Sequence, residues 1–175
     1  MTSDVPSRLR EEQIAVEQQI RRAFRGVTRA GGVSWSESVV IDNHGSEAEA
    51  AAAREQDTEQ SWEDLVDDPN WIEDPGIGGF NFLDPIGFAY YIAPAMIRSA
   101  RRGHGEFVGY ALHIDGEFKR ELVSRLSPAQ RHATARFVRF MIAVHQAIGD
   151  HLYGETWKDA YKAYWKLWDV GNTKA

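Results

Sequence analysis

The fold of this chain is decided by one stretch, FLDPIGFAYYIAPAM, at residues 82–96. Asp84 is a good N-cap for a helix, and Pro85 suits the first helical position, where its missing N–H has no partner to lose. Pro94 then falls inside the predicted helix and deprives the Tyr90 carbonyl of its hydrogen-bond donor. The stretch therefore predicts a buried, well-capped helix with a kink or break near Pro94.

This broken rule also makes the stretch a candidate binding site, because local violations inside a consistent segment often mark function or strain. The free Tyr90 carbonyl could line a small-molecule pocket with four other side chains. These candidate binding residues are Trp62, Asp84, Tyr90, Tyr91 and Pro94. The alternative is that both tyrosines belong to the core and that a side chain or water satisfies the carbonyl.

Length and composition indicate one globular domain, residues 1–175, with a sizeable core. The chain has six tryptophans and no cysteine, which excludes disulfides, thiolate metal sites and cysteine nucleophiles. The N-terminus up to Arg25 is charged, without the apolar core of a signal peptide, and no apolar run is long enough for a membrane span. We expect a soluble, cytoplasmic protein.

Hydrophobic spacing and capping signals predict a mainly α-helical protein, an irregular bundle of about five to seven helices. Ser46 and Glu49 form a capping box, and Ser127 with the following proline and glutamine forms another helix start. Residues 33–41 have strand composition, which adds one short strand or hairpin to the expectation. The expected helices are Ser7 to Val27, Ala48 to Glu59, the stretch from Asp84, Glu106 to Ile114, Glu117 to Leu126, Ser127 to about Leu152, and Glu155 to Asp169.

The last of these helices carries an aromatic stripe along one face. One interpretation docks it against the bundle as an amphipathic helix. The other makes residues 155–175 an appendage or interface element that binds a partner or forms a homodimer. The candidate interface residues are Trp157, Tyr161, Tyr164, Trp165 and Trp168.

Charge is segregated along the chain, whose net charge is −6. From Ile41 to Asp84 there are 13 acidic residues and one basic residue, whereas Pro85 to Phe140 holds 9 basic and 4 acidic residues. The acidic flank could fold onto the basic one, or it could form an acidic surface that attracts a basic partner. The acidic block disfavours nucleic acid as a partner, because it would repel phosphates.

No motif for catalysis stands out. The six histidines lack zinc-binding spacing, no Gly-x-Ser-x-Gly elbow is present, and Gly76–Gly79 lacks the lysine of a phosphate-binding loop. Adjacent carboxylates in the segment 57–84 are typical of a solvated loop. The sequence thus predicts no metal, no cofactor and no catalytic residue, and it favours a non-enzymatic protein.

The chain resembles an uncharacterised family of small bacterial proteins, a domain of unknown function. The likeness covers roughly residues 14 to 150 and depends on four features: Ile20–Phe24, Trp62, the Phe-Leu-x-Pro-x-x-Phe-x-Tyr-Tyr-x-x-Pro-Ala core at Phe82–Ala95, and Leu126–Gln130. The segment after Gly154 lies outside it. Many members carry a Cys-x-x-Cys pair where this chain has Asn43–Glu47. The resemblance indicates a family but does not imply any activity for the chain.

These features favour a non-enzymatic interaction protein of bacterial or phage origin, of the immunity, antidote or regulatory-partner type, that uses an acidic surface. The alternative is a small-molecule-binding protein or enzyme with its pocket at Tyr90, Tyr91 and Pro94. We therefore expect a protein partner, either a basic protein or a second copy of the chain in a homodimer, and no membrane association.

Overall fold

The computed structural model describes residues 5–170, and within them the chain is helical, with no β-strand. The mainly α-helical prediction is confirmed, although the nine α-helices of this part of the chain exceed the five to seven expected. Three short 3-10 helices join them (η1, Ser7–Leu9; η2, Gly79–Phe82; η3, Trp165–Trp168). The α-helices are α1 (Arg10–Ala23), α2 (Trp35–Asp42), α3 (Glu47–Arg54), α4 (Asp64–Asp67), α5 (Pro85–Arg102), α6 (Glu106–Ala111), α7 (Glu117–Leu122), α8 (Pro128–Ile148) and α9 (His151–Ala163).

Helix α5 begins as its sequence predicts. The Asp84 carboxylate accepts a hydrogen bond from the Gly87 N–H at 2.8 Å, and Pro85 opens the first turn. Gly103 ends the helix with φ of 88°, a left-handed conformation that glycine adopts without steric cost. The predicted break at Pro94 does not occur, because α5 continues through it to Arg102.

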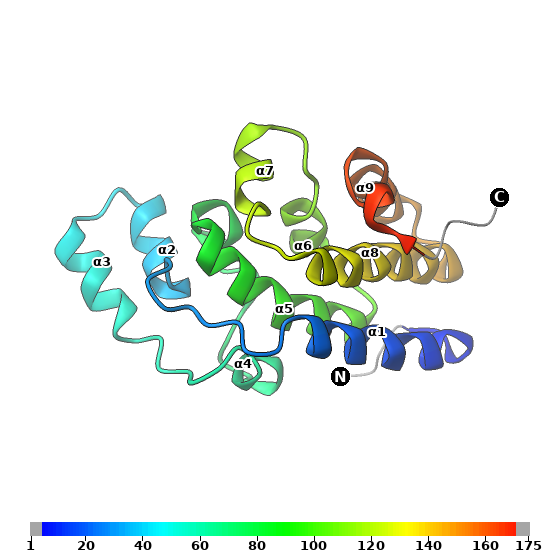
Figure 1. Ribbon diagram of the computed structural model, residues 1–175, viewed down its shortest axis with the longest axis horizontal. Helices are drawn as coiled ribbons and strands as arrows, with labels where there is room; N and C mark the ends of the chain where they lie inside the picture. The colour runs from blue at the N-terminus through cyan, green and yellow to red at the C-terminus, as the bar shows by residue number, and fades with distance from the viewer. Residues whose placement is uncertain (1–4, 171–175) are drawn as a thin grey trace.

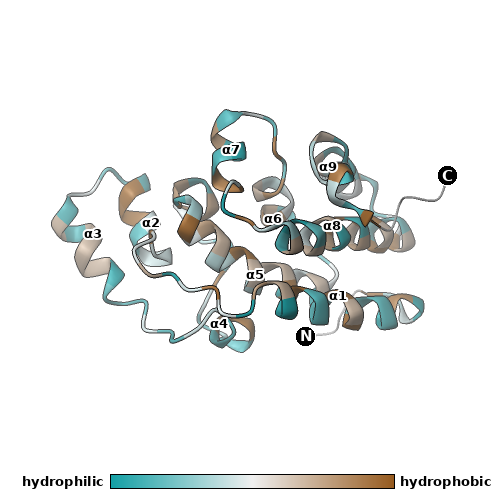
Figure 2. Cartoon of the chain, in the orientation of Figure 1, coloured by the Kyte–Doolittle hydropathy of each residue, from teal (hydrophilic) through white to brown (hydrophobic). Residues whose placement is uncertain are grey.

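Helices α1, α5 and α8 pack against one another, and α5 lies near the middle of the molecule (Figure 1). Helix α5 contacts α1 and α8 as well as α4, α6 and α7, while α1 also contacts α8. Helices α2 and α3 contact each other at one end of the molecule, and α9 lies against α8 at the other (Figure 1). Hydrophobic residues run along α5, as Figure 2 shows, and most of its side chains are buried.

The predicted strand at residues 33–41 is wrong, because this segment forms α2. The Ser34 side chain accepts from the Glu37 N–H at 3.3 Å, and the Glu37 carboxylate accepts from the Ser34 N–H at 3.0 Å. This capping box satisfies two N–H groups that would otherwise lack partners at the helix start. Alternation of Val33, Trp35, Val39 and Ile41 suggested a strand, but the capping box and the burial of Trp35 decide for a helix.

The other capping boxes are confirmed at Ser46 for α3 and Ser127 for α8. Helix α8 ends at Ile148, earlier than expected, because Gly149 turns left-handed with φ of 75°. Asp150 then caps α9 by accepting from the Tyr153 N–H at 3.3 Å, so the last helix begins before its predicted start. Among residues 5–170, no helix has both the length and the apolar character that a membrane span requires.

Candidate functional site

The Tyr91 hydroxyl joins three parts of the chain. It accepts a hydrogen bond from the Trp35 backbone N–H at 3.0 Å and donates one to Oε1 of Glu59, also at 3.0 Å. The same carboxylate pairs with Nε of Arg29 at 3.3 Å. Helix α5, the start of α2 and the loop at residues 55–63 thus meet at one buried phenol.

Both tyrosines of the motif stay protonated at neutral pH. Burial, followed by the nearby charge of Glu59, raises the pKa of Tyr91. The same two causes, burial first, raise the pKa of Tyr90. A phenol that does not ionise can position groups through hydrogen bonds but is a poor general base.

The other predicted binding residues lie in or beside the core. Trp62 is fully buried, and its Nε1–H donates to the Phe24 carbonyl at 3.0 Å. Asp84 caps α5 and also accepts from the Val33 N–H at 2.9 Å, which ties the segment before α2 to α5. Pro94 is buried inside α5. These contacts favour a role in the core for the three residues.

A hollow of about 560 Å³ adjoins the Tyr91 junction, and we call it the tryptophan hollow. It lies between the start of α2, the loop at residues 56–60, α4 and the loop at residues 68–75. Trp35 and Trp71 line it, with ring centroids 5.3 Å apart in an edge-to-face arrangement. Trp71 is in turn covered by the Arg98 guanidinium, 5.3 Å from its ring centroid.

Four carboxylates line the tryptophan hollow, and no basic side chain does: Asp57, Glu59, Asp64 and Asp68. Glu59 is paired with Arg29. In the described part of the chain, the other three form no ion pair. They accept instead from serine or backbone groups, at 2.7 Å for Asp57, 2.9 Å for Asp64 and 2.8 Å for Asp68. Such bonds hold the carboxylates in place without neutralising their charge.

Other acidic residues of the segment do fold onto the basic flank. Glu73 pairs with both Arg98 and Arg102 of α5, and Asp67 pairs with Arg101 at 2.6 Å. The interpretation of an acidic flank folded onto a basic one therefore holds for part of the segment. These pairs use arginines of α5 and leave Asp57, Asp64 and Asp68 of the tryptophan hollow without an ion pair in the described part of the chain.

Tyr90 lines a second hollow, of about 340 Å³, together with Arg29, Arg54 and Glu59. Arg54 donates to the Gly32 carbonyl at 2.9 Å and pairs with Glu37. The Tyr90 side chain is almost fully buried, so it presents only an edge to this hollow. Of the predicted set, only Tyr90 lines one of these two hollows, and the other four residues lie in or beside the core.

The C-terminal aromatic residues contact the protein itself. Trp157 and Trp165 are fully buried, and Nε1 of Trp165 donates to the Leu112 carbonyl at 2.7 Å. Tyr161 donates to Asp169 at 2.8 Å, Tyr164 accepts from Arg131 at 2.9 Å, and Trp168 lies beneath the same arginine. A partner could not reach Trp157 or Trp165 without undocking α9, which favours the amphipathic-helix interpretation.

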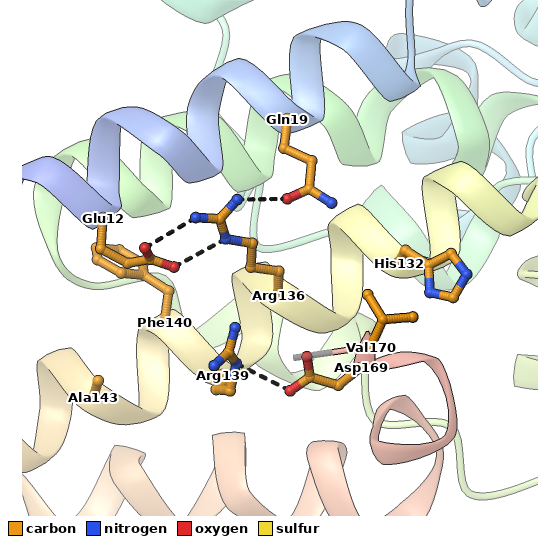
Figure 3. A pocket seen from close by; sticks show the side chains of 9 residues that line it. All are labelled: Glu12, Gln19, His132, Arg136, Arg139, Phe140, Ala143, Asp169 and Val170. Carbon is orange, nitrogen blue, oxygen red and sulfur yellow. Dashed lines mark hydrogen bonds and ion pairs between the residues drawn. The ribbon is translucent and has the colours of Figure 1, made fainter. Parts of the chain in front are cut away.

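A further hollow, of about 400 Å³, lies between α1, α8 and the chain near Asp169 (Figure 3). Arg136 reaches across it to both oxygens of Glu12, at 2.9 Å each, and to Gln19 at 2.8 Å. Arg139 pairs with Asp169 at 3.0 Å. The charges of this hollow compensate one another. The ion pairs connect α1 and the C-terminal segment to α8.

Within residues 5–170, no three His, Asp or Glu side chains gather closely enough to hold a metal ion. Sequence reasoning missed Trp35, Trp71 and Glu59 as members of the site. The sequence predicts a strand for Trp35 and does not distinguish Glu59 from the other acidic residues of its segment. The signal that could have found them is the acidic segment itself, which contains Trp71 and Glu59 and lies directly before the aromatic helix.

The structure so far defines a class: a helical protein with an acidic, tryptophan-lined hollow beside its central helix. The chain belongs to DUF6714, a family of unknown function, whose model matches residues 12–168. The expectation that the segment after Gly154 lies outside the family is wrong, because the match includes α9 and η3. Comparisons with curated proteins and with solved structures find no match.

Proposed function

We propose that the protein is a non-enzymatic interaction protein of bacterial or phage origin, of the immunity, antidote or regulatory-partner type. Its tryptophan hollow would bind a basic side chain of a protein partner in the cytoplasm. The observation that carries the proposal is the lining of this hollow, which holds four carboxylates and no basic group. Long-range attraction to such a surface speeds the association of a basic partner and selects against acidic ones.

The surroundings of the hollow support a binding role over a catalytic one. Asp57, Asp64 and Asp68 are held by local backbone and serine groups, and burial raises the pKa of Tyr91 above its ordinary value. Carboxylates held in place in this way suit the binding of a cationic side chain.

The test is capture of a partner from native lysate by tagged protein, with the partner's charge and the complex mass measured. The double variant Asp64→Asn and Asp68→Asn should lose the partner, because asparagine keeps an oxygen for the local hydrogen bonds but removes both charges. The matched control is Glu47→Gln with Glu55→Gln, two exposed charges of the α3 region outside the hollow. We expect the control to retain the partner.

Two results would contradict the proposal. One is a strictly monomeric protein that recovers no partner at low salt. The other is equal loss of the partner in the hollow variant and in the α3 control. That result would mean that binding depends on the net charge of the protein and not on the hollow. Because exposed charge pairs weaken with salt, binding that is insensitive to salt would also count against a basic partner.

A small-molecule-binding role, enzymatic or not, is the second candidate. The observation that favours it is the hollow lined by Tyr90, Arg29 and Arg54, which offers cationic donors beside a phenol. Thermal-shift screening with nucleotides and metabolites tests it. A compound that raises the melting temperature of the wild type, but not of Tyr90→Phe, would favour this role over a protein partner.

A further inference from the structure

A second surface lies next to the tryptophan hollow and is apolar at its centre. Phe107 and Tyr110 of α6 and Ile72 of the loop at residues 68–75 are large hydrophobic side chains that are 50%, 54% and 59% exposed. Phe107 and Tyr110 are three residues apart and so share a face of α6. Exposed apolar groups that cluster in this way commonly mark a binding surface.

These side chains surround two adjoining hollows. Phe107 and Tyr110 line one of about 270 Å³, and Phe107 with Ile72 lines another of about 370 Å³. Ile72 also lines the tryptophan hollow. Ile72 therefore lines both the tryptophan hollow and the hollow next to α6.

The charge around the apolar centre is acidic in the smaller hollow and mixed in the larger one, where Arg98 and Arg102 both pair with Glu73. The smaller hollow is lined by Asp42, Glu73 and Asp74 and by no basic side chain. Glu73 is neutralised by arginines of α5, but Asp42 and Asp74 form no ion pair within residues 5–170. Asp42 accepts from the Gly78 N–H at 2.7 Å, and Asp74 accepts from the Gly76 N–H at 3.2 Å.

The loop that carries Asp74 is anchored before any partner arrives. The Gly79 N–H donates to the buried Ser38 hydroxyl of α2 at 2.9 Å. The backbone at Gly78 approaches α2 so closely that a Cβ there would lie 2.7 Å from the Val39 nitrogen. A surface that is already ordered loses less entropy on binding than a mobile loop would.

We define the α6 surface as Asp42, Ile72, Asp74, Phe107 and Tyr110. We propose that this surface is a docking site for a basic amphipathic helix of the partner protein. The apolar face of that helix would cover Phe107 and Tyr110, and its lysines or arginines would reach Asp42 and Asp74. Helix-in-groove recognition uses this combination of spaced apolar anchors and flanking charge. The inference rests on the proposed function, since it gives the same basic partner a second point of contact.

The test uses a synthetic amphipathic peptide of leucine and lysine at helical spacing, titrated into the full-length protein by calorimetry and NMR. The double variant Phe107→Ser and Tyr110→Ser should weaken peptide binding roughly tenfold, the loss typical of removing central interface aromatics. Phe118→Ser is the matched control, because Phe118 is 53% exposed on α7 and lines neither hollow. A peptide with glutamate in place of lysine should not bind.

Each remaining outcome decides against the docking site. Equal binding to wild type and Phe107→Ser/Tyr110→Ser, or equal weakening by Phe118→Ser, would overturn it, as would no binding of the lysine peptide. Self-association that the same double variant abolishes would instead make the α6 surface a homodimer interface. If Asp64→Asn/Asp68→Asn loses the lysate partner while Phe107→Ser/Tyr110→Ser retains it, the docking site fails and the proposed function stands.

Discussion

The Tyr91 hydroxyl accepts the backbone N–H of Trp35 across 3.0 Å, and this bond connects residues 56 positions apart in the chain. It satisfies a buried N–H at the first residue of α2, where no helical carbonyl is available. Because the same hydroxyl also donates to Glu59, the central helix directly orders the wall of the tryptophan hollow. Tyr91, predicted as a binding residue, therefore positions the residues that line the hollow and does not line it itself.

Replacing Tyr91 with phenylalanine should destabilise the protein by about 1 to 3 kcal/mol, the usual penalty for leaving a buried polar group without its partner. The variant orphans the Trp35 N–H and removes a donor from Glu59. Tyr90→Phe is the control, because its hydroxyl makes no hydrogen bond within residues 5–170 and its ring contact with Tyr91 is kept. Urea denaturation measures the free energy of unfolding of both variants. Equal stability of the two would show that the hydrogen bonds of the Tyr91 hydroxyl do not stabilise the fold.

Gly78 should tolerate alanine much less well than Gly76 does. Both have positive φ, 80° and 73°, so both substitutions carry the left-handed penalty of about 1 to 2 kcal/mol. At Gly76 a Cβ meets nothing within 4 Å, whereas at Gly78 it meets the α2 backbone at 2.7 Å. We expect Gly78→Ala to lose about 2 to 4 kcal/mol in total. Similar midpoints for the two variants in thermal unfolding would mean that the loop is not held against α2.

Stability should fall in acid partly through Glu17. Burial raises the pKa of this carboxyl, but hydrogen bonds from Arg101 and Arg21 outweigh burial and leave it below the ordinary value of 4.5. The unfolded chain therefore binds a proton before the folded one does, and the stabilisation is present above pH 4.5 and lost as pH falls through the folded pKa.

Glu17→Gln should accordingly flatten the decline of unfolding free energy below about pH 4.5, measured by urea titration at several pH values. The exposed Glu121→Gln on α7 serves as the control and should keep the wild-type slope. A steeper decline in Glu17→Gln than in the wild type would show that the carboxyl is not stabilised by these arginines.

Trp165 and Leu167, two residues apart in η3, distinguish a core role of the C-terminal segment from a peripheral one. Trp165→Ala should destabilise by about 3 to 5 kcal/mol, because it leaves a cavity and removes the donor to the Leu112 carbonyl. Leu167 is 85% exposed, so Leu167→Ala should change stability by less than about 0.5 kcal/mol. A mild effect of Trp165→Ala would return the segment to the status of an appendage.

Local chemistry made the helix starts at Ser46, Asp84 and Ser127 predictable, because a cap and its partner lie three residues apart in the sequence. The same signal was present at Ser34 and Glu37, yet the alternating apolar residues around it favoured a strand. Burial of Trp35 against Trp71 and Tyr91 settles the segment as a helix, and those contacts come from distant parts of the chain. The hydrophobic periodicity of residues 33–41 carries no information about these distant contacts.

The candidate site was less predictable than the helices. The sequence predicts burial for the aromatic central helix, and Trp62, Tyr90 and Tyr91 are buried. Which carboxylates stay uncompensated could not be predicted. Asp67 and Glu73 meet arginines of α5, whereas Asp64 and Asp68, close to them in sequence, do not.

The sequence by itself determined the helical class, the capped central helix and the acidic character of the segment before it, because these depend on contacts within a few residues. Tertiary structure alone decided that Pro94 leaves α5 unbroken, that Tyr91 supports α2, and that Trp35 and Trp71 share a hollow with unpaired carboxylates. The physical reason is range. Capping and propensity act over one helical turn, whereas burial and charge compensation depend on which distant elements come together.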